Sequence, residues 1–254
     1  IWDGNHAIPT LREAFEDKPD FVCITIATPN YNKSIEIANS FIQLRYGKFR
    51  RTFHHKLRLV AGGAHVAAYP DEELTLKVFD YIVAGHGDGE QALLDIVHGK
   101  AKEQVVKARF IENLDELPLP DYESLDMTKY NLMLEGQKAI TMSTSRGCVY
   151  SCFYCGSATI KKFRAHSSEY VVYHMRYLYE NYGIRAFYFV DDIFTFDMKR
   201  VEKICELIHV NLPLRDITIR ATTRSNLLTQ ELCYKMKDAG VSIISIGLES
   251  GSPK

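Results

Sequence analysis

The chain has 254 residues with a formal net charge of −1, of which 46% are hydrophobic and 25% charged; these proportions are ordinary for a globular protein. No apolar run approaches the ~20 residues that a membrane-spanning helix requires, and the first residues lack the pattern of a signal peptide. The balanced charge gives no general attraction to nucleic acid or acidic lipid, and the length allows two modest domains or one barrel.

The first part of the chain alternates strands and helices. Strands are predicted at residues 21–27, 57–61 and 81–84, where continuous apolar runs are typical of strands buried on both faces of a sheet. Helices are predicted at residues 34–46, 72–77 and 91–97. This alternation indicates a doubly wound α/β sheet, whose ligands bind beyond the carboxyl ends of the strands.

The segment between residues 45 and 58 is basic and contains Phe49 and Phe53 but no acidic residue. Cations interleaved with aromatic rings are a combination that single-stranded nucleic acids bind. The alternative is a solvated loop, and the net charge does not favour a basic binding domain. We therefore expect no nucleic-acid partner.

Residues 101–138 are predicted to be a linker. The sequence Leu117-Pro118-Leu119-Pro120 cannot continue a helix or a central strand, and the flanking segments show no clean period. The expected organisation is thus a first domain at residues 1–100, a linker at 101–138 and a second domain at 139–254.

The second domain repeats a strand and a helix several times. Strands are predicted at residues 139–145, 186–190, 217–221 and 241–246, with helices starting near Ser167, Met198 and Thr229. Such repeats predict a parallel β/α barrel or part of one, with its site at the carboxyl ends of the strands. The polar residues found at these ends are Asp191, Asp192, Arg224 and Glu249.

Three cysteines follow the first of these strands. Cys148, Cys152 and Cys155 have the spacing C-x3-C-x2-C, and both [4Fe–4S] clusters and structural zinc usually take four ligands. Three thiolates therefore indicate a cluster with one iron open to a small molecule. The alternatives are a zinc site completed by His166 and a chance grouping among the six cysteines.

The remaining cysteines, Cys23, Cys205 and Cys233, lie scattered in apolar contexts. They do not suggest a disulfide framework. We therefore expect a reducing cytoplasm, where thiolates stay available to metal.

The cysteine spacing, with Tyr154 just before the last cysteine, resembles that of the radical S-adenosylmethionine (radical SAM) enzymes. The resemblance implies that the three cysteines hold a [4Fe–4S] cluster whose open iron binds S-adenosylmethionine, which is then cleaved reductively to a 5′-deoxyadenosyl radical. Further along the chain, residues 189–194 and 247–251 resemble family segments that contact this molecule. The contacts implied for S-adenosylmethionine are Tyr154, Asp191, Asp192, Arg224, Gly247, Glu249 and Ser250.

The first domain is similar to the cobalamin-binding domain that precedes many radical SAM barrels. Paired glycines would let the backbone approach a flat macrocycle. The implied cobalamin contacts are Thr25, Pro29, Asn30, Gly62, Gly63, Gly87 and Glu90. The predicted fold is thus a partial Rossmann-like cobalamin-binding domain followed by a partial parallel (β/α) radical SAM barrel.

Four departures from the family pattern stand out. The first strand and helix of the cobalamin domain are missing, so that any D-x-H-x-x-G loop with a cobalt-ligating histidine would lie upstream of Ile1. Asp88 stands where glutamate is usual, and His174 stands where relatives commonly carry glutamate. The repeats stop after the fourth strand, so we expect a further segment or a partner to close the barrel.

The resemblance implies a cobalamin-dependent methyltransferase that acts on an unactivated carbon. Its partners would be a small-molecule or natural-product substrate and a reductant protein such as flavodoxin or ferredoxin. The alternatives are a cobalamin-independent ring-forming or rearrangement enzyme and a non-catalytic iron–sulfur or zinc-binding module.

Overall fold

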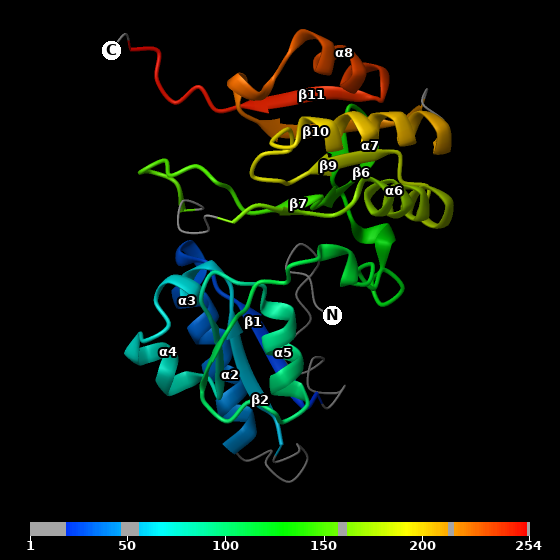
Figure 1. Cartoon of the computed structure of the whole chain (residues 1–254). Helices are drawn as coiled ribbons and strands as arrows, with labels where there is room; N and C mark the ends of the chain where they lie inside the picture. Colours follow the sequence, from blue (N-terminus) through cyan, green and yellow to red (C-terminus); the bar gives the residue numbers. More distant parts are fainter. Residues whose placement is uncertain (1–18, 47–55, 157–161, 213–215, 253–254) are drawn as a thin grey trace. The chain divides into compact units, whose positions relative to one another are not determined.

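The protein is represented by a computed structural model that describes residues 19–46, 56–156, 162–212 and 216–252 (Figure 1). It divides into two compact units, the first ending at Ile111 and the second beginning at Glu112. Each unit is built on its own parallel sheet with helical connections. The predicted α/β fold class is confirmed.

The first unit contains a four-stranded parallel sheet with the order β1-β2-β3-β4. A 3-10 turn at Thr28–Asn30 leads from β1 into the first helix. Ile26, Phe41, Leu59 and Ile82 are among the buried residues of its core. The strands are β1 (Phe21–Thr25), β2 (Arg58–Gly62), β3 (Tyr81–Ala84) and β4 (Val105–Lys107), and the helices are α2 (Tyr31–Tyr46), α3 (Ala64–Ala68), α4 (Glu73–Val78) and α5 (Gly89–Val97).

The second unit contains a five-stranded sheet with the order β11-β10-β9-β6-β5. Only β5 runs antiparallel within this sheet, as a hairpin with β6. A separate antiparallel pair, β7 and β8, frames the cysteine loop. The strands are β5 (Met133–Leu134), β6 (Gln137–Met142), β7 (Ser145–Arg146), β8 (Arg164–Ala165), β9 (Ala186–Phe189), β10 (Thr218–Thr223) and β11 (Val241–Ile246).

Three helices cover this sheet: α6 (Ser168–Tyr182), α7 (Met198–Asn211) and α8 (Gln230–Asp238). Their starts follow from local chemistry, because Ser167, Asp197 and Thr229 each accept a hydrogen bond from a backbone N–H of the first turn. Helix α6 ends at Gly183, whose φ of 63° lies in the left-handed region. In Figure 1 the strands β10 and β11 point away from the helical side, toward the cysteine loop.

The segment predicted as a linker contains structure that the sequence pattern did not indicate. Residues Val105–Lys107 form β4 against β3, and Leu114, Tyr122 and Met127 are buried. A strand of three residues is too short to show a hydrophobic period. The three buried residues stand singly in an irregular segment, so no pattern predicts their burial. Tyr122 and Met127 belong to the core of the second unit.

Most of the basic segment, residues 47–55, lies outside the described residues. The two arginines at its edges pair with one carboxylate: Arg45 lies 2.9 Å and Arg58 3.5 Å from Asp80. These two arginines therefore form ion pairs inside the first unit. Among the helices that the structure describes, none is both long and apolar enough to cross a bilayer.

Candidate active site

The cysteine loop leaves the sheet at the carboxyl end of β6 and returns through β8. Its base is the short ladder in which Ser145 faces Ala165 and Arg146 faces Arg164. Gly147 then turns the chain with a φ of 85°, a conformation that glycine adopts without strain. The structure thus places the loop at the strand end where the sequence predicted it.

The three cysteines of the loop are free thiols, with Cys148 and Cys152 half-buried and Cys155 exposed. Burial raises the pKa of Cys148, and the charges of Asp192, Cys155 and Cys152 raise it further. Within the described residues, no three His, Cys, Asp or Glu side chains converge as metal ligands do. Ligand sets of this kind commonly assemble only when the metal binds, and three soft thiols with an unfilled fourth position fit an iron–sulfur cluster.

His166, the histidine considered for a zinc site, is occupied elsewhere. Its Nδ1 lies 3.1 Å from Asp115 Oδ1, and its ring stacks on Tyr170 with centroids 4.1 Å apart. Burial lowers its pKa, against the opposing effect of Asp115. The geometry gives no support to His166 as a fourth ligand.

Arg224 reaches the cysteine loop from the end of β10. Its Nη1 lies 3.4 Å from Cys152 Sγ, and its guanidinium carbon lies 4.1 Å from the centroid of the Tyr150 ring. The hydrogen bond to Cys152 is the largest cause of the raised pKa of Arg224. The strand end of β10 thus places a cation against the sulfur of Cys152.

Glu249 reaches the same loop from beyond β11. Desolvation raises the pKa of Tyr154 in the loop, and the nearby charges of Glu249 and Cys152 raise it further. Glu249 has a φ of 56°, and such backbone strain in a residue other than glycine is often found at functional sites. Its carboxylate folds back to Gly247, while Ser250 is exposed and accepts a hydrogen bond from Ser252 N–H.

The two adjacent aspartates after β9 differ in their surroundings. Asp191 is 3% exposed, and its oxygens accept hydrogen bonds from Thr144 N (2.6 Å), Thr144 Oγ1 (2.5 Å) and Ser145 Oγ (2.7 Å). Asp192 is exposed, and its charge acts on Cys148. The structure therefore brings Asp192 to the cysteines and buries Asp191 beneath the loop.

Several residues at this end of the sheet were missed by the sequence reasoning. Tyr150 lies inside the loop, with the guanidinium of Arg224 over its ring. Its position between two cysteines of the motif could have identified it as a site residue. On the sheet itself, Arg220 lies 4.5 Å over the Tyr188 ring and donates to Ser245 Oγ at 3.1 Å. A charged residue inside the apolar strand 217–221 was the signal for this group.

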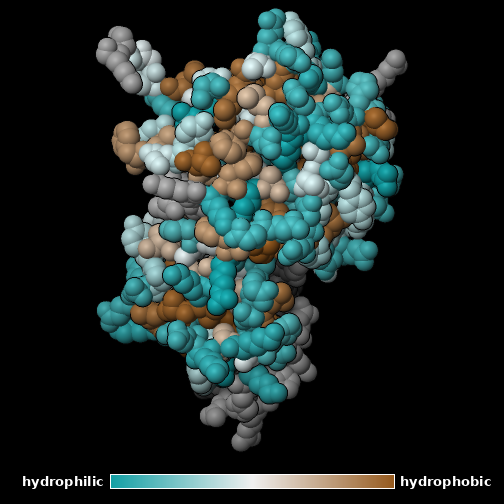
Figure 2. All heavy atoms as spheres, in the orientation of Figure 1, coloured by the Kyte–Doolittle hydropathy of each residue, from teal (hydrophilic) through white to brown (hydrophobic). Residues whose placement is uncertain are grey.

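Apolar side chains accompany the polar ones near the loop. Phe153 is 97% and Leu248 79% exposed, and Val149, Tyr154 and Ile246 are also exposed. In the view of Figure 2, apolar side chains gather in the second unit on the side toward which β10 and β11 point, whereas the helical side is mostly hydrophilic. Such a surface suits a bound organic molecule better than bulk water.

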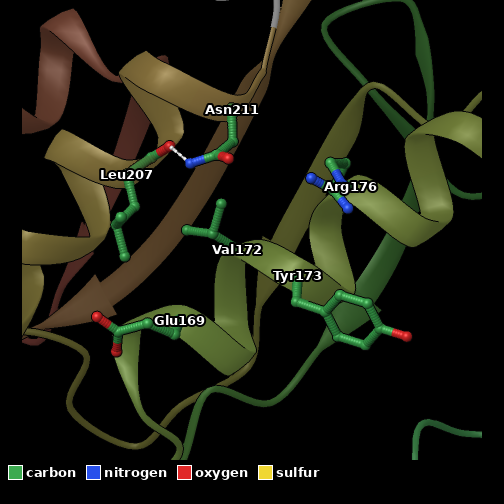
Figure 3. A pocket seen from close by; sticks show the side chains of 6 residues that line it. All are labelled: Glu169, Val172, Tyr173, Arg176, Leu207 and Asn211. Carbon is green, nitrogen blue, oxygen red and sulfur yellow. Dashed lines mark hydrogen bonds between the residues drawn. The ribbon is translucent and has the colours of Figure 1, made fainter.

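A shallow groove of about 200 Å³ lies between α6 and α7 (Figure 3). It is lined by Glu169, Val172, Tyr173, Arg176, Leu207 and Asn211. None of these residues belongs to the cysteine loop or to the strand ends, so the groove is separate from the candidate site.

In the first unit, the predicted cobalamin contacts lie at the ends of β1, β2 and β3. Some of their glycines are needed for close packing of the backbone, and one borders open space. A Cβ on Gly63 would lie 2.6 Å from Ile26 O, and one on Gly87 would lie 2.7 Å from the carbonyl of Ala108. These two glycines are thus required by the packing of the chain itself. Gly62 has no heavy atom within 4 Å of its Cβ position, which leaves open space at the end of β2.

The other predicted contacts lie nearby on the same unit. Asn30 accepts a hydrogen bond from Ala27 N–H at 2.8 Å and so closes the 3-10 turn that contains Pro29. Thr25 is exposed at the end of β1, and Glu90 lies in the first turn of α5.

His65 lies beside these residues and was not predicted to be part of the site. Its Nδ1 lies 3.1 Å from Thr28 Oγ1 and its Nε2 2.8 Å from Glu72 Oε2. Because both ring nitrogens have partners, His65 is held in place as a buried link between the ends of β1 and β2.

The chain was compared with known proteins. Residues 142–254 match the radical SAM superfamily. A protein named as an uncharacterised methyltransferase of Pyrococcus horikoshii is 29% identical over 93% of this chain and 53% of its own length. The bacteriochlorophyllide d C-8(2)-methyltransferase of Chlorobaculum tepidum is 26% identical over 96% of this chain and 54% of its own length. The chain therefore spans about half the length of the curated relatives it matches.

The fold is shared with a solved structure. The cobalamin-dependent S-adenosylmethionine radical enzyme OxsB, solved with aqua-cobalamin bound, superposes with a TM-score of 0.72 at 18% identity, covering 95% of this chain and 37% of that one. The superfamily to which residues 142–254 match uses a [4Fe–4S] cluster and S-adenosylmethionine. Residues 142–254, which contain the cysteine loop, therefore match the radical SAM superfamily of enzymes, and the chain is similar in sequence to proteins named as methyltransferases.

Proposed function

We propose that this chain forms the cofactor-binding core of a cobalamin-dependent radical SAM methyltransferase that methylates an unactivated carbon. The observation that carries the proposal is the contact of Arg224, from the end of β10, with Cys152 in the cysteine loop. The charge of Glu249, from beyond β11, acts on Tyr154 of the same loop. The names of the relatives as methyltransferases support the reaction type.

In this proposal Cys148, Cys152 and Cys155 hold the cluster. Once bound, the cluster would supply the electron that splits the sulfonium bond of S-adenosylmethionine and releases the 5′-deoxyadenosyl radical. Arg224 lies within hydrogen-bonding distance of the sulfur of Cys152. The three thiolates leave one iron for the amino and carboxylate groups of the methionine part.

The surrounding residues bind the rest of S-adenosylmethionine. We assign Asp192 to accept a hydrogen bond from the amino group of the methionine part, because its carboxylate is exposed and its charge acts on Cys148. Arg224 can clamp a carboxylate with two parallel N–H groups. Tyr154 is assigned to the adenine, and Gly247, Glu249 and Ser250 to the ribose and methionine.

Cobalamin is assigned to the first unit. The open space beside Gly62 is the feature that fits the edge of a macrocycle. Around it we place Thr25, Pro29, Asn30, Gly63, Gly87 and Glu90, with Gly63 and Gly87 shaping the turns. Cobalamin would carry the methyl group that the substrate receives.

The remaining parts of the proposal concern partners. The substrate is a small molecule or natural product, and the reductant is a flavodoxin or ferredoxin. We place the protein in a reducing compartment because all six cysteines are free.

The test is anaerobic reconstitution with iron and sulfide, followed by measurement of 5′-deoxyadenosine after reduction. Wild type should contain about four irons per chain and form 5′-deoxyadenosine, as should Cys233→Ala, which alters a cysteine outside the loop. Zinc without iron would contradict the proposal. Retention of hydroxocobalamin after desalting tests the first unit separately, and no retention would favour a cobalamin-independent enzyme.

A further inference from the structure

The start of the cysteine loop rests on a buried carboxylate. Asp191 accepts hydrogen bonds from the backbone N–H and the hydroxyl of Thr144 and from the hydroxyl of Ser145, all at 2.7 Å or less. Thr144 and Ser145 are themselves buried, at 0% and 3% exposure. Burial of a carboxylate is costly unless several donors compensate it, and here all three donors belong to the residues that lead into the loop.

The two ends of the loop are joined by one guanidinium. Arg200, on α7, donates from Nε to His166 O at 2.6 Å and from Nη2 to Thr144 O at 2.7 Å. Thr144 O also accepts from His166 N–H at 3.0 Å. The residue before the loop and the residue after it are therefore held by the same side chain.

The charges of this arrangement are complementary. Burial lowers the pKa of Arg200, and the negative charge of Asp191 is the largest effect that opposes this change. On the outer side, Asp115 Oδ1 accepts from Ser167 N–H at 3.0 Å and lies 3.1 Å from His166 Nδ1. The residues after the loop are thus held by Asp115 and Arg200, and the residues before it by Asp191 and Arg200.

We propose that Asp191 is a positioning residue, which fixes the loop that carries Cys148, Cys152 and Cys155 without contacting the cluster or S-adenosylmethionine. The link to the cluster rests on the proposed function, because the purpose of a fixed loop is to hold its ligands. Ligand sets function only when their supporting residues fix them to within about 0.5 Å. Removing the carboxylate frees three donors at the base of the loop and takes from Arg200 the anion with the largest effect on it.

The first test is amide hydrogen exchange of the apo chain, which needs neither iron nor substrate. We expect Asp191→Ala to speed exchange in residues 144–156 by about tenfold or more, while α6 and α7 keep their protection. The matched control is Asp126→Ala, which removes a carboxylate that accepts from Thr128 N–H at 3.1 Å and Thr128 Oγ1 at 2.5 Å in an exposed turn. This control should leave exchange in the loop unchanged.

The second test is reconstitution of the same variants. Asp191→Ala should retain less than half of the wild-type iron, and the electron paramagnetic resonance spectrum of its reduced cluster should differ from wild type. Asp191→Asn keeps one acceptor for Thr144 N–H, and its amide can donate to a hydroxyl. It should restore most of the iron and the wild-type spectrum, which a loss of general stability would not explain.

The outcomes separate the two proposals. Unchanged loop exchange in Asp191→Ala would overturn the positioning role, whatever the iron content. Faster loop exchange in a chain that takes up no iron, even as wild type, would overturn the proposed function but leave the positioning role standing. Should Asp191→Ala fail to fold, Thr144→Val removes one hydroxyl donor alone, and unchanged loop exchange in that variant would also overturn the proposal.

Discussion

The carboxyl ends of the two sheets both carry motifs that the sequence singled out, but these motifs differ in structural meaning. In the second unit, Arg224 and Glu249 come from distant stretches and meet the cysteine loop. In the first unit, Gly63 and Gly87 fit closely against the backbone of their own unit. A motif whose side chains converge from separate strands points to chemistry, whereas a glycine motif can serve the fold alone.

The pair Gly62 and Gly63 tests this difference most strongly. Gly63→Ala should destabilise the first unit by about 2–4 kcal/mol, because its φ is 102° and its Cβ would lie 2.6 Å from Ile26 O. Gly62→Ala should change stability by less than about 1 kcal/mol and instead reduce the retention of cobalamin. Urea unfolding and desalting after hydroxocobalamin measure the two effects, and equal destabilisation by both variants would break the distinction.

His174 tests the interior of the second unit, away from either sheet end. Its Nε2 lies 2.8 Å from the hydroxyl of Tyr122, and burial lowers its pKa to about 4. Because the unfolded chain binds this proton more tightly, with a pKa of ~6.5, the stabilisation is complete above that pH and is lost as pH falls toward 4. The loss should reach about 3 kcal/mol.

The measurement for His174 is urea unfolding at a series of pH values. His174→Gln keeps an acceptor for Tyr122 but cannot be protonated, so its stability should fall less steeply between pH 6.5 and 4. Identical slopes for variant and wild type would show that other groups cause the loss.

Arg224 tests the convergence at the second sheet. Arg224→Lys keeps the charge but loses the planar pair of donors and the stacking on Tyr150. We expect the KM for S-adenosylmethionine to rise about 10- to 100-fold, with little change in the free energy of unfolding. The control is Arg176→Lys, in an exposed pair on α6, and an unchanged KM in Arg224→Lys would remove Arg224 from the site.

The smallest effect is expected at the helix cap that follows the loop. Ser167→Ala removes the hydrogen bond that its Oγ accepts from Tyr170 N–H at 3.1 Å. This should cost about 1 kcal/mol of unfolding free energy. Yields of 5′-deoxyadenosine per iron should stay at the wild-type value, and a lower yield would mean that α6 contributes to the site.

Much of the fold could be predicted because its strands and helices are long enough to show a period. The strand expected at residues 186–190 is β9, and the helix expected to start near Ser167 is α6. Strand β4 and the buried Tyr122 could not be predicted, since three residues or one ring leave no pattern.

The candidate site could be predicted where its residues lie close together in the sequence. The cysteine spacing indicated the loop, but Asp191 and Asp192 are neighbours of the same type, and only burial distinguishes them. Arg200 was not singled out from the sequence, because its role depends on two carbonyls more than thirty residues away. Contacts of this kind depend on the folded chain.

The central claim is that the cysteine loop holds a cluster that cleaves S-adenosylmethionine. The most direct measurement is 5′-deoxyadenosine formed by anaerobically reconstituted wild type, by Cys148→Ala, Cys152→Ala and Cys155→Ala, and by Cys233→Ala. We predict formation by wild type and Cys233→Ala and none by the three loop variants. Formation of 5′-deoxyadenosine by any of the loop variants, or its absence in wild type that contains iron and sulfide, would contradict the claim.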